Sequence, residues 1–384
     1  MNIIRCASVL FDKSEREYLL KTMNPFWLSS GKWVREFESG LSKFLDAKFC
    51  VACNSGSSAN LLAVSALMSL GVSAGDEIIT TALCFPTTVS PIVQNGLIPV
   101  FVDVNRKMTI DIGKMKKAIT SKTKAIIVAH TLGIPSDMGA IMDIAKKYKF
   151  WVIEDNCDAL GSKWGGKYTG TIGDMGTLSF YPAHHITTGE GGMVITNKPE
   201  ISKVIKSLRD WGRDCHCETG QDNSCGKRHK MQFGALPQGY DHKYVFTRLG
   251  YNLKMTDLQA AIGCAQLKKL PRILKLRHRN WELIVGRKLS DSIAPFGALF
   301  YSNKRQEIIK TFEDNGIQTR MVFAGNITKQ PMMNGVKYRI VGDLKRTDYI
   351  MNNAFWVGCH PNLTKVQITK MRGFLEYESS RLYY

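Results

Sequence analysis

Residues 179–192 read Ser-Phe-Tyr-Pro-Ala-His-His-Ile-Thr-Thr-Gly-Glu-Gly-Gly, and the β-favouring run 177–181 leads into them. A strand followed by a loop punctuated with glycines predicts that the side chains at the loop tip face a cleft. His184 and His185 lie at this tip. An imidazole can take up and return a proton near neutral pH. The stretch therefore favours an acid–base residue at the end of a strand over a merely polar loop pair.

Strand-like and helix-like segments alternate along the chain before this loop. Runs typical of buried strands cover residues 78–81, 98–103, 125–130 and 151–155. Such alternation predicts an α/β fold with a largely parallel sheet and a site at the carboxyl ends of its strands. Asp155 closes the last of these runs, so we expect its carboxyl group in that site.

A turn of small residues between an apolar run and a helical segment precedes these strands. Residues 49–53 form a short apolar run, residues 54–60 read Asn-Ser-Gly-Ser-Ser-Ala-Asn, and residues 61–67 have a helical composition. A helix that begins at a turn of small residues presents free N–H groups and binds anions. Gly56, Ser57 and Ser58 are therefore candidate phosphate-binding residues. Cys50 and Cys53 form a C-x-x-C pair, which we interpret as two small buried side chains rather than a redox centre.

The composition limits the kind of protein. The chain has 384 residues, of which 44% are hydrophobic and 22% charged, values ordinary for a globular protein with two packed lobes. No apolar run approaches the ~20 residues of a membrane helix. Residues 1–13 lack the pattern of a signal peptide. We therefore expect a cytoplasmic protein that does not enter a membrane.

The formal net charge of +19 argues for an anionic partner. The basic residues are spread out and no nucleic-acid-binding motif occurs, so we do not expect nucleic acid as a partner. A nucleotide-linked substrate and an acidic electron donor are the alternatives. Residues 161–168 nearly match a P-loop, but neither Ser nor Thr follows Lys167 and no helical pattern comes after it. We reject that motif.

Together these segments resemble the DegT/DnrJ/EryC1/StrS family of sugar aminotransferases, which bind pyridoxal phosphate (PLP). The resemblance covers nearly the whole chain, is strongest over residues 155–261, and includes residues 28–38. It implies the aminotransferase fold of type I, with a mostly parallel central sheet flanked by helices and a small C-terminal α+β domain. The large domain would take residues 1–264 and the small domain residues 265–384.

Members of the family carry a lysine where this chain has His184. That lysine holds the cofactor as a Schiff base, and an imidazole has no primary amine with which to do so. The resemblance therefore implies untethered pyridoxamine phosphate (PMP), with His184 as its base.

The resemblance also assigns roles to other residues. Asp155 would bond the pyridine nitrogen and keep it protonated, and Phe85 would stack on the ring. Asn252 would reach the cofactor phosphate of a second subunit, which implies a homodimer. Core packing of Phe85 and Tyr181 and a helix cap for Asn252 are the alternatives. The cofactor-binding candidates are Gly56, Ser57, Ser58, Phe85, Asp155, Asp158, Ser179 and Asn252, and the substrate-binding candidates are Ser30, Tyr181, His185, Arg320 and Asn326.

Four cysteines follow the spacing C-x57-C-x-C-x7-C, namely Cys157, Cys215, Cys217 and Cys225. Four thiolates can hold a [2Fe–2S] cluster or a structural zinc, and spacing alone favours neither. Cys157 follows Asp155 by two residues, which span only ~7 Å of extended chain. A metal site so close to the cofactor ring suits electron transfer, so we expect the cluster. The spacing also resembles the iron–sulfur branch of the family, with an insertion at about residues 210–245.

This branch implies a concrete activity. It is the PMP- and [2Fe–2S]-dependent dehydration at C3 of a CDP-linked 4-keto-6-deoxyhexose in 3,6-dideoxysugar biosynthesis, with electrons from an iron–sulfur flavoprotein reductase. One alternative is a PMP-dependent 3-dehydratase without a redox partner. Another is a non-catalytic homologue that binds a nucleotide-sugar, because the small domain looks shortened between Ile293 and Thr311.

Residues 226–230, Gly-Lys-Arg-His-Lys, follow the last of the four cysteines directly. A solvated charge run is the ordinary interpretation of such a segment. We expect it to help dock the acidic reductase by electrostatic steering.

Overall fold

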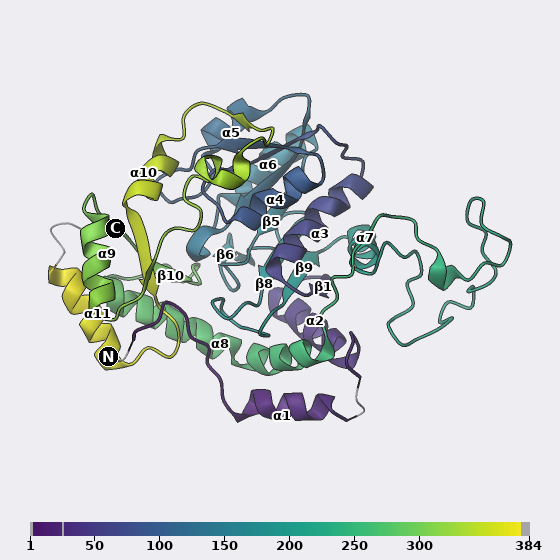
Figure 1. The fold of residues 1–384 in the computed structure, drawn as a ribbon, viewed down its shortest axis with the longest axis horizontal. Coiled ribbons are helices and arrows are strands. Elements are labelled where there is room, and N and C mark those ends of the chain that lie inside the picture. The colour runs from purple at the N-terminus through teal and green to yellow at the C-terminus, as the bar shows by residue number, and fades with distance from the viewer. Residues whose placement is uncertain (1–2, 25–26, 378–384) are drawn as a thin grey trace.

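The computed structural model describes residues 3–24 and 27–377 (Figure 1). At its centre lies an eight-stranded sheet with the strand order β1–β9–β8–β5–β4–β2–β3–β12. Neighbouring strands are parallel except where β9 pairs with β1 and β8. The strands are β1 (Phe49–Cys53), β2 (Glu77–Thr81), β3 (Ile98–Val102), β4 (Thr123–Ala129), β5 (Trp151–Asp155), β8 (Met175–Ser179), β9 (Gly192–Thr196) and β12 (Arg339–Ile340).

Helices cover both faces of this sheet, and strands that are apolar on both sides require such cover. The helices are α2 (Lys32–Leu45), α3 (Gly56–Ser69), α4 (Pro86–Gln94), α5 (Ile112–Ala118), α6 (Met138–Tyr148), α7 (Pro199–Arg209) and α8 (Asp257–Val285), and α1 (Lys13–Thr22) packs on α8. In β1, Val51 and Cys53 pack with α3 and α7, whereas Cys50 and Ala52 pack with α2 and α8. The predicted α/β class with helices around a mostly parallel sheet is confirmed, and the C-x-x-C pair is buried as expected.

The C-terminal region is built on a second, antiparallel sheet with the strand order β10–β13–β11. Its elements are β10 (Gly297–Tyr301), α9 (Arg305–Asp314), β11 (Thr319–Arg320), α10 (Lys345–Asn353), β13 (Ala354–Gly358) and α11 (Lys365–Tyr377). Phe300, Phe312 and Phe355 are fully buried in its core. A small α+β unit therefore stands beside the main sheet.

Two elements join the C-terminal region to the main one. α8 runs without a break through the predicted boundary at 264/265, with Cys264 in the core of the main region and Ile284 in that of the C-terminal region. β12 pairs with β3 and extends the main sheet. The division at 264/265 stays a prediction.

Between α7 and α8, residues 212–250 leave the body as an arm (Figure 1). β-Bridges join Asp210 to Asn252 and Arg213 to Phe246 at its root. The arm has little regular structure beyond the 3-10 turn η2 (His242–Tyr244). It covers most of the range predicted for an insertion. None of the helices in the described ranges is long and apolar enough to span a membrane.

Candidate active site

A cavity of about 940 Å³ opens at the carboxyl ends of the parallel strands. Residues of the main region form part of its wall, and they include Ser55, Gly56, Phe85, Asp155 and His184. The C-terminal region supplies the rest, including Phe296, Gln318, Arg320, Phe323 and Trp356. Ligand sites of open α/β folds lie at this edge of the sheet, so the cavity is the candidate active site.

Asp155, the last residue of β5, holds a central place in the wall. Its Oδ2 accepts hydrogen bonds from Asn60 Nδ2 at 2.9 Å and from Thr88 Oγ1 at 2.6 Å. Thr177 Oγ1 in turn donates to Asn60 Oδ1 across 2.6 Å. Side chains from α3, α4 and β8 thus fix the carboxylate that faces the cavity.

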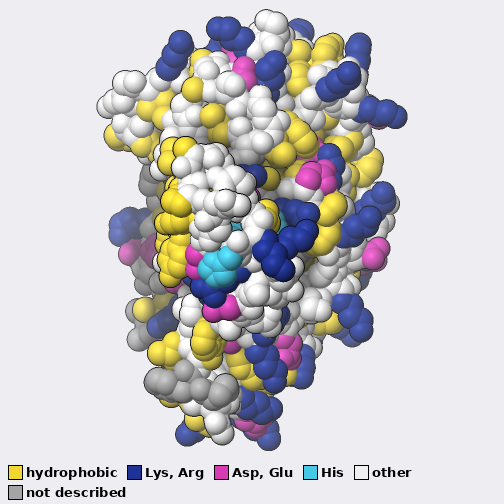
Figure 2. Space-filling view, turned by 90° about the vertical axis from the view of Figure 1, so that its right-hand side faces the viewer, with side chains coloured by type: hydrophobic (Ala, Val, Ile, Leu, Met, Phe, Trp, Pro, Cys, Tyr) yellow, Lys and Arg dark blue, Asp and Glu magenta, His cyan; other side chains and the backbone are white. Residues whose placement is uncertain are grey.

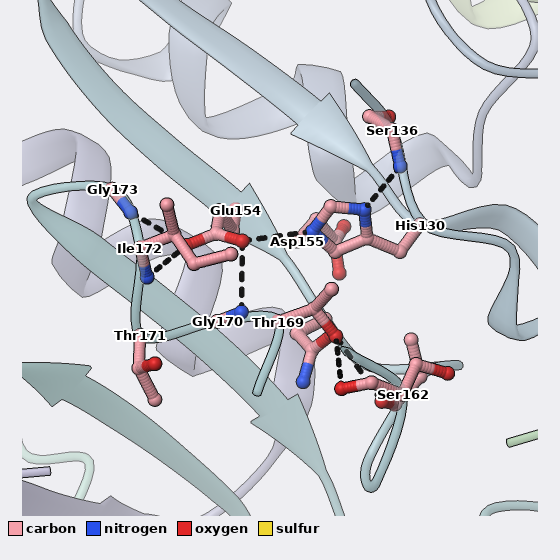
Figure 3. A network of polar contacts seen from close by, with 12 residues as sticks. His130, Ser136, Glu154, Asp155, Ser162, Thr169, Gly170, Thr171, Ile172 and Gly173 are labelled. Carbon is pink, nitrogen blue, oxygen red and sulfur yellow. Dashed lines mark hydrogen bonds and ion pairs between the residues drawn. The ribbon is translucent and has the colours of Figure 1, made fainter. Parts of the chain in front are cut away.

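A buried network beside Asp155 secures the end of β5 (Figure 3). Glu154 accepts hydrogen bonds from the backbone N–H groups of Gly170, Ile172 and Gly173. His130 Nδ1 accepts from the Ser136 N–H at 3.1 Å, so Nε2 carries the proton that is donated to Glu154 across 2.9 Å. The network is internal to the protein and positions the neighbouring carboxylate.

His184 lies in the cavity wall with its side chain 14% exposed. Its Nδ1 has no hydrogen-bond partner and lies 3.7 Å from Asp158 Oδ1. Burial, assisted by the nearby Arg277 guanidinium, lowers the pKa of His184 to about 4. Burial and the neighbouring Asp155 carboxylate raise the pKa of Asp158 to about 8. At neutral pH the imidazole is therefore a free base beside a protonated carboxyl group.

The N-terminus of α3 forms another part of the cavity wall. Ser55 caps this helix, since its Oγ accepts a hydrogen bond from the Ser58 N–H at 3.0 Å. A Cβ atom on Gly56 would come within 2.5 Å of Ser179 Cβ, so only glycine lets the helix start approach β8 so closely. Free N–H groups, the Ser57 hydroxyl and the nearby Ser179 form a donor set that suits a phosphate. Together with Asp155 at the far wall, the residues present fit PMP.

The four predicted metal-ligating cysteines lie in two places. Cys157 lines the large cavity, whereas Cys215, Cys217 and Cys225 line a hollow of about 10 Å³ in the arm. No group of three or more His, Cys, Asp or Glu side chains in the described part of the chain is arranged to hold a metal ion. The expectation that four thiols of one chain meet beside Asp155 is therefore not met, because the arm carries three of them away from β5. Within a single chain these residues do not fit a [2Fe–2S] cluster.

Most of the remaining predicted residues do gather at the cavity. Phe85, 52% exposed, meets Phe323 edge to face with ring centroids 6.1 Å apart. The predicted residues that line the cavity are Gly56, Ser57, Phe85, Asp155, Cys157, Asp158, Ser179, Tyr181, His184 and Arg320.

Five predicted residues lie elsewhere. Ser58 sits behind the start of α3, and Ser30 lines a separate groove beside the arm root. His185 is buried, with Nε2 at 3.1 Å from the Ala294 carbonyl oxygen. Asn326 is also buried and donates to Asp348, so neither side chain meets the cavity. Asn252 accepts a hydrogen bond from Lys254 at the arm root, outside the cavity of its own chain.

Comparison with known proteins agrees with the fold described above. Residues 10–375 match the model of the DegT/DnrJ/EryC1/StrS aminotransferase family. The chain belongs to that family. It is 48% identical over 388 residues to the lipopolysaccharide biosynthesis protein RfbH of Salmonella typhimurium, across 94% of this chain and 89% of the relative. It is 43% identical to the dTDP-4-dehydro-2,6-dideoxy-D-glucose 3-dehydratase of Saccharopolyspora spinosa, across 95% and 84% of the two chains.

Solved structures of the family agree with the fold. The Escherichia coli GDP-4-keto-6-deoxy-D-mannose-3-dehydratase with bound hydrated PLP superposes with a TM-score of 0.88 at 29% identity, over 97% of this chain and 99% of that one. A structure of GDP-4-keto-6-deoxymannose-3-dehydratase with a trapped PLP-glutamate geminal diamine gives 0.87 at 28% identity. The superposition covers nearly all of both chains.

The structure adds residues to the DegT/DnrJ/EryC1/StrS site that sequence reasoning missed. Asn60 and Thr88 both bond Asp155 from the first turns of α3 and α4. Other polar residues share both helices, so no sequence signal distinguishes these two. Arg277 holds the His184 loop from α8. It is one basic residue among many in that helix, and no sequence signal distinguishes it.

Proposed function

We propose that this member of the family removes the C3 hydroxyl group of a nucleotide-linked 4-keto-6-deoxyhexose, with PMP as its cofactor. The observation that carries the proposal is His184, a neutral imidazole in the cavity wall, at the residue where the resemblance would place the family lysine. Two further facts support it, since one relative is named a 3-dehydratase of a dTDP-linked sugar and another of a GDP-linked sugar. We also propose that the enzyme is cytoplasmic and that its substrate is an anionic small molecule.

When bound, PMP supplies an amine that condenses with the C4 ketone and a pyridine ring that takes up electrons. The protein has to hold it without a covalent bond. The start of α3 at Gly56 and Ser57, with Ser179, would bind the phosphate, and Phe85 would lie against the ring. Asp155 would pair with the pyridine nitrogen, because Asn60 and Thr88 fix the orientation of its carboxylate.

His184 would move the proton that this chemistry requires. Its imidazole is unprotonated at neutral pH, because burial lowers its pKa to about 4, so it can accept a proton from C4′ of the cofactor. With that proton on His184, the C3 hydroxyl group of the sugar could leave as water by taking up the proton that the imidazole returns. Tyr181 and Arg320 line the open side of the cavity and would contact the sugar and its nucleotide.

We further propose that reduction follows dehydration. The dehydrated sugar needs two electrons before release as a 3-deoxy ketosugar, and a [2Fe–2S] cluster would supply them one at a time. Its four candidate ligands do not meet within one chain, so such a cluster would need ligands from more than one copy. An iron–sulfur flavoprotein reductase would be the donor. The cysteine spacing resembles a branch with CDP-linked substrates, so CDP is our proposal for the nucleotide. Relatives named for dTDP- and GDP-linked sugars make those two the alternatives.

A second candidate is the dehydratase without a redox partner, in which glutamate restores PMP. The TM-score of 0.87 with the structure that contains a PLP-glutamate geminal diamine favours it. The three cysteines gathered on the arm favour the redox enzyme instead.

A single-turnover experiment tests the proposal. Purified enzyme loaded with PMP is mixed anaerobically with CDP-, dTDP- and GDP-linked 4-keto-6-deoxyhexoses, and mass spectrometry follows the loss of the C3 hydroxyl group. We expect loss from the CDP sugar, and no covalent attachment of PLP to the wild-type protein after borohydride treatment. His184→Lys should acquire that attachment and lose dehydration. A wild-type enzyme that fixes PLP on a lysine, or leaves every sugar unchanged, contradicts the proposal.

A further inference from the structure

The predicted cluster ligands form two incomplete sets within one chain. Cys215, Cys217 and Cys225 surround a small hollow in the arm, where Cys217 Sγ accepts a hydrogen bond from Ser224 Oγ at 3.1 Å. Cys157 lies in the wall of the large cavity, with its N–H at 3.3 Å from Asp155 Oδ1. A [2Fe–2S] cluster takes four thiolates. The arm therefore lacks one ligand, and the cavity lacks three.

The arm has hydrogen bonds of its own, and on one side it also contacts the body, where Glu218 pairs with Arg35 of α2 at 3.0 Å. Arg228 forms two hydrogen bonds to Asp241, at 2.8 and 2.6 Å, and His242 bonds Asp214 at 2.7 Å. The arm stands at one end of the longest axis of the molecule, beyond α7 (Figure 1). Its bonded framework keeps the three cysteines together at a distance from β5 of the same chain.

The arm also exposes large apolar side chains. Leu249 is 98% exposed, Tyr244 58% and Phe246 51%. Figure 2 looks onto this end of the molecule and shows hydrophobic side chains gathered along one side of the surface, next to a group of Lys and Arg. Apolar side chains gathered in this way mark an interaction surface more often than a free one. The mouth of the cavity is open as well, with Phe85 and Tyr181 each 52% exposed.

We propose that the cluster is shared between two copies of this chain, with Cys157 from one copy and the three arm cysteines from the other. The inference rests on the proposed function, because it takes the cluster from there. A second copy is the occupant that the observations favour, since each chain carries one cavity that needs three thiols and one arm that has them. A two-fold axis completes both sites at once, as isologous contacts do. The same contact buries the apolar side of the arm against the partner and brings Asn252, at the arm root, towards the partner's cavity.

Mixed dimers separate this arrangement from a cluster within one chain. Two differently tagged copies are expressed together, one with Cys157→Ala and the other with Cys215→Ala, Cys217→Ala and Cys225→Ala. The doubly tagged dimer is purified anaerobically, and its iron, acid-labile sulfide and visible absorption are measured. A shared cluster leaves one complete site in this dimer, so we expect about half the iron and sulfide of the wild type. If each cluster is held within one chain, this mixed dimer has no complete site and should contain neither iron nor sulfide.

The outcomes are distinct. An iron-free mixed dimer beside a loaded wild type overturns the proposal, and so does full loading of the Cys157→Ala homodimer. A wild-type protein free of iron and sulfide overturns the proposal together with the predicted cluster, whereas loss of the C3 hydroxyl group in single turnover would still stand. A dimer of two tagged wild-type copies is the control for assembly.

A second variant tests the surface without changing a ligand. Leu249→Asp places a charge on the apolar side of the arm, so we expect a monomer by light scattering and loss of most of the iron although all four cysteines are present. Leu20→Asp is the matched control, since Leu20 is 61% exposed on α1, and it should stay dimeric and loaded. A Leu249→Asp monomer that retains the wild-type iron content per chain overturns the proposal.

Discussion

Arg277 donates a hydrogen bond from Nη2 to the backbone carbonyl oxygen of His184 across 2.9 Å. The same guanidinium donates to the carbonyl oxygens of Ala183 at 3.1 Å and Phe296 at 3.2 Å. Arg277 belongs to α8 and is 1% exposed. A single buried side chain of the helix that joins the two regions therefore holds the loop that presents the proposed base.

Replacing Arg277 should weaken the whole protein. In Arg277→Met one buried and two part-buried carbonyl oxygens lose their donor, and each loss costs up to about 1–3 kcal/mol. We expect the free energy of unfolding to fall by about 3–5 kcal/mol, measured by urea denaturation. Arg272→Met, an exposed position on the same helix, should stay within about 0.5 kcal/mol of the wild type. Equal stability of the two variants would show that the guanidinium does not support the loop.

Thr88 should matter for turnover rather than for folding. Thr88→Val keeps the shape of the side chain but removes the hydroxyl group that donates to Asp155 across 2.6 Å. A hydrogen bond to a charged group is worth about 1.5–3 kcal/mol. We therefore expect single-turnover dehydration to slow by at least about tenfold. Ser90→Ala removes a hydroxyl group that bonds only Pro86 on the same helix, so it should leave the rate unchanged.

Asp103 should stabilise the protein at neutral pH and lose that effect in acid. Burial acts to raise the pKa of Asp103, but hydrogen bonds from Thr347, Arg346 and Lys114 outweigh it and hold the pKa below its usual value. A carboxyl group whose pKa is lower in the folded than in the unfolded state stabilises the protein at pH values above its unfolded-state pKa of about 3.9. This stabilisation is lost as the pH falls through the pKa of the folded state. Asp103→Asn should therefore cost about 1–3 kcal/mol at neutral pH.

Urea denaturation of the wild type and Asp103→Asn at several pH values checks this. The difference in unfolding free energy should shrink as the pH falls below about 4. The control is Asp343→Asn, which bonds the same Lys114 from a half-exposed position and should cost no more than about 1 kcal/mol. A difference in unfolding free energy that grows as the pH falls would contradict the prediction.

The basic run that follows Cys225 should affect the rate of reduction. Inside the arm Arg228 is bonded to Asp241 and His229 Nδ1 lies 3.3 Å from the Gly239 carbonyl oxygen. Lys227 and Lys230 are therefore the exposed cations of the run that can meet a partner. Lys227→Glu with Lys230→Glu should slow electron transfer from an acidic reductase by about tenfold or more at low salt. Dehydration in single turnover should not change. The same charge reversal at Lys116 and Lys117, exposed on α5, is the control, and equal reduction rates at low salt would remove the docking hypothesis.

Much of the main sheet could be predicted from the sequence, because buried parallel strands are short apolar runs between helices. The run 151–155 is β5 to the residue, and the run 98–103 differs from β3 by one residue. The basic helix α8 spans Asp257–Val285. The sequence carries signals for both of its ends, namely the capping box of Thr256 with Gln259 at its start and Gly286, in a left-handed conformation, at its end.

The candidate site was predictable only where residues lie next to each other in the sequence. The loop that carries His184 and the turn at Gly56 do reach the cavity. The short distance between Asp155 and Cys157 along the chain predicts where Cys157 lies, but it does not place a segment more than fifty residues further on. Where that segment goes depends on the hydrogen bonds inside the arm and at its root, such as the bridge from Asp210 to Asn252. Such tertiary contacts leave no periodic trace in the sequence.

The pairing of β12 with β3 has a mechanical consequence. Arg339 of β12 bonds Glu77 of β2 through two hydrogen bonds, at 3.0 and 2.7 Å, while α8 joins the same two regions elsewhere. Two separate connections leave the two regions fewer directions in which to move relative to each other than one connection would. We therefore expect the loops and side chains at the rim of the cavity to move more easily than its walls.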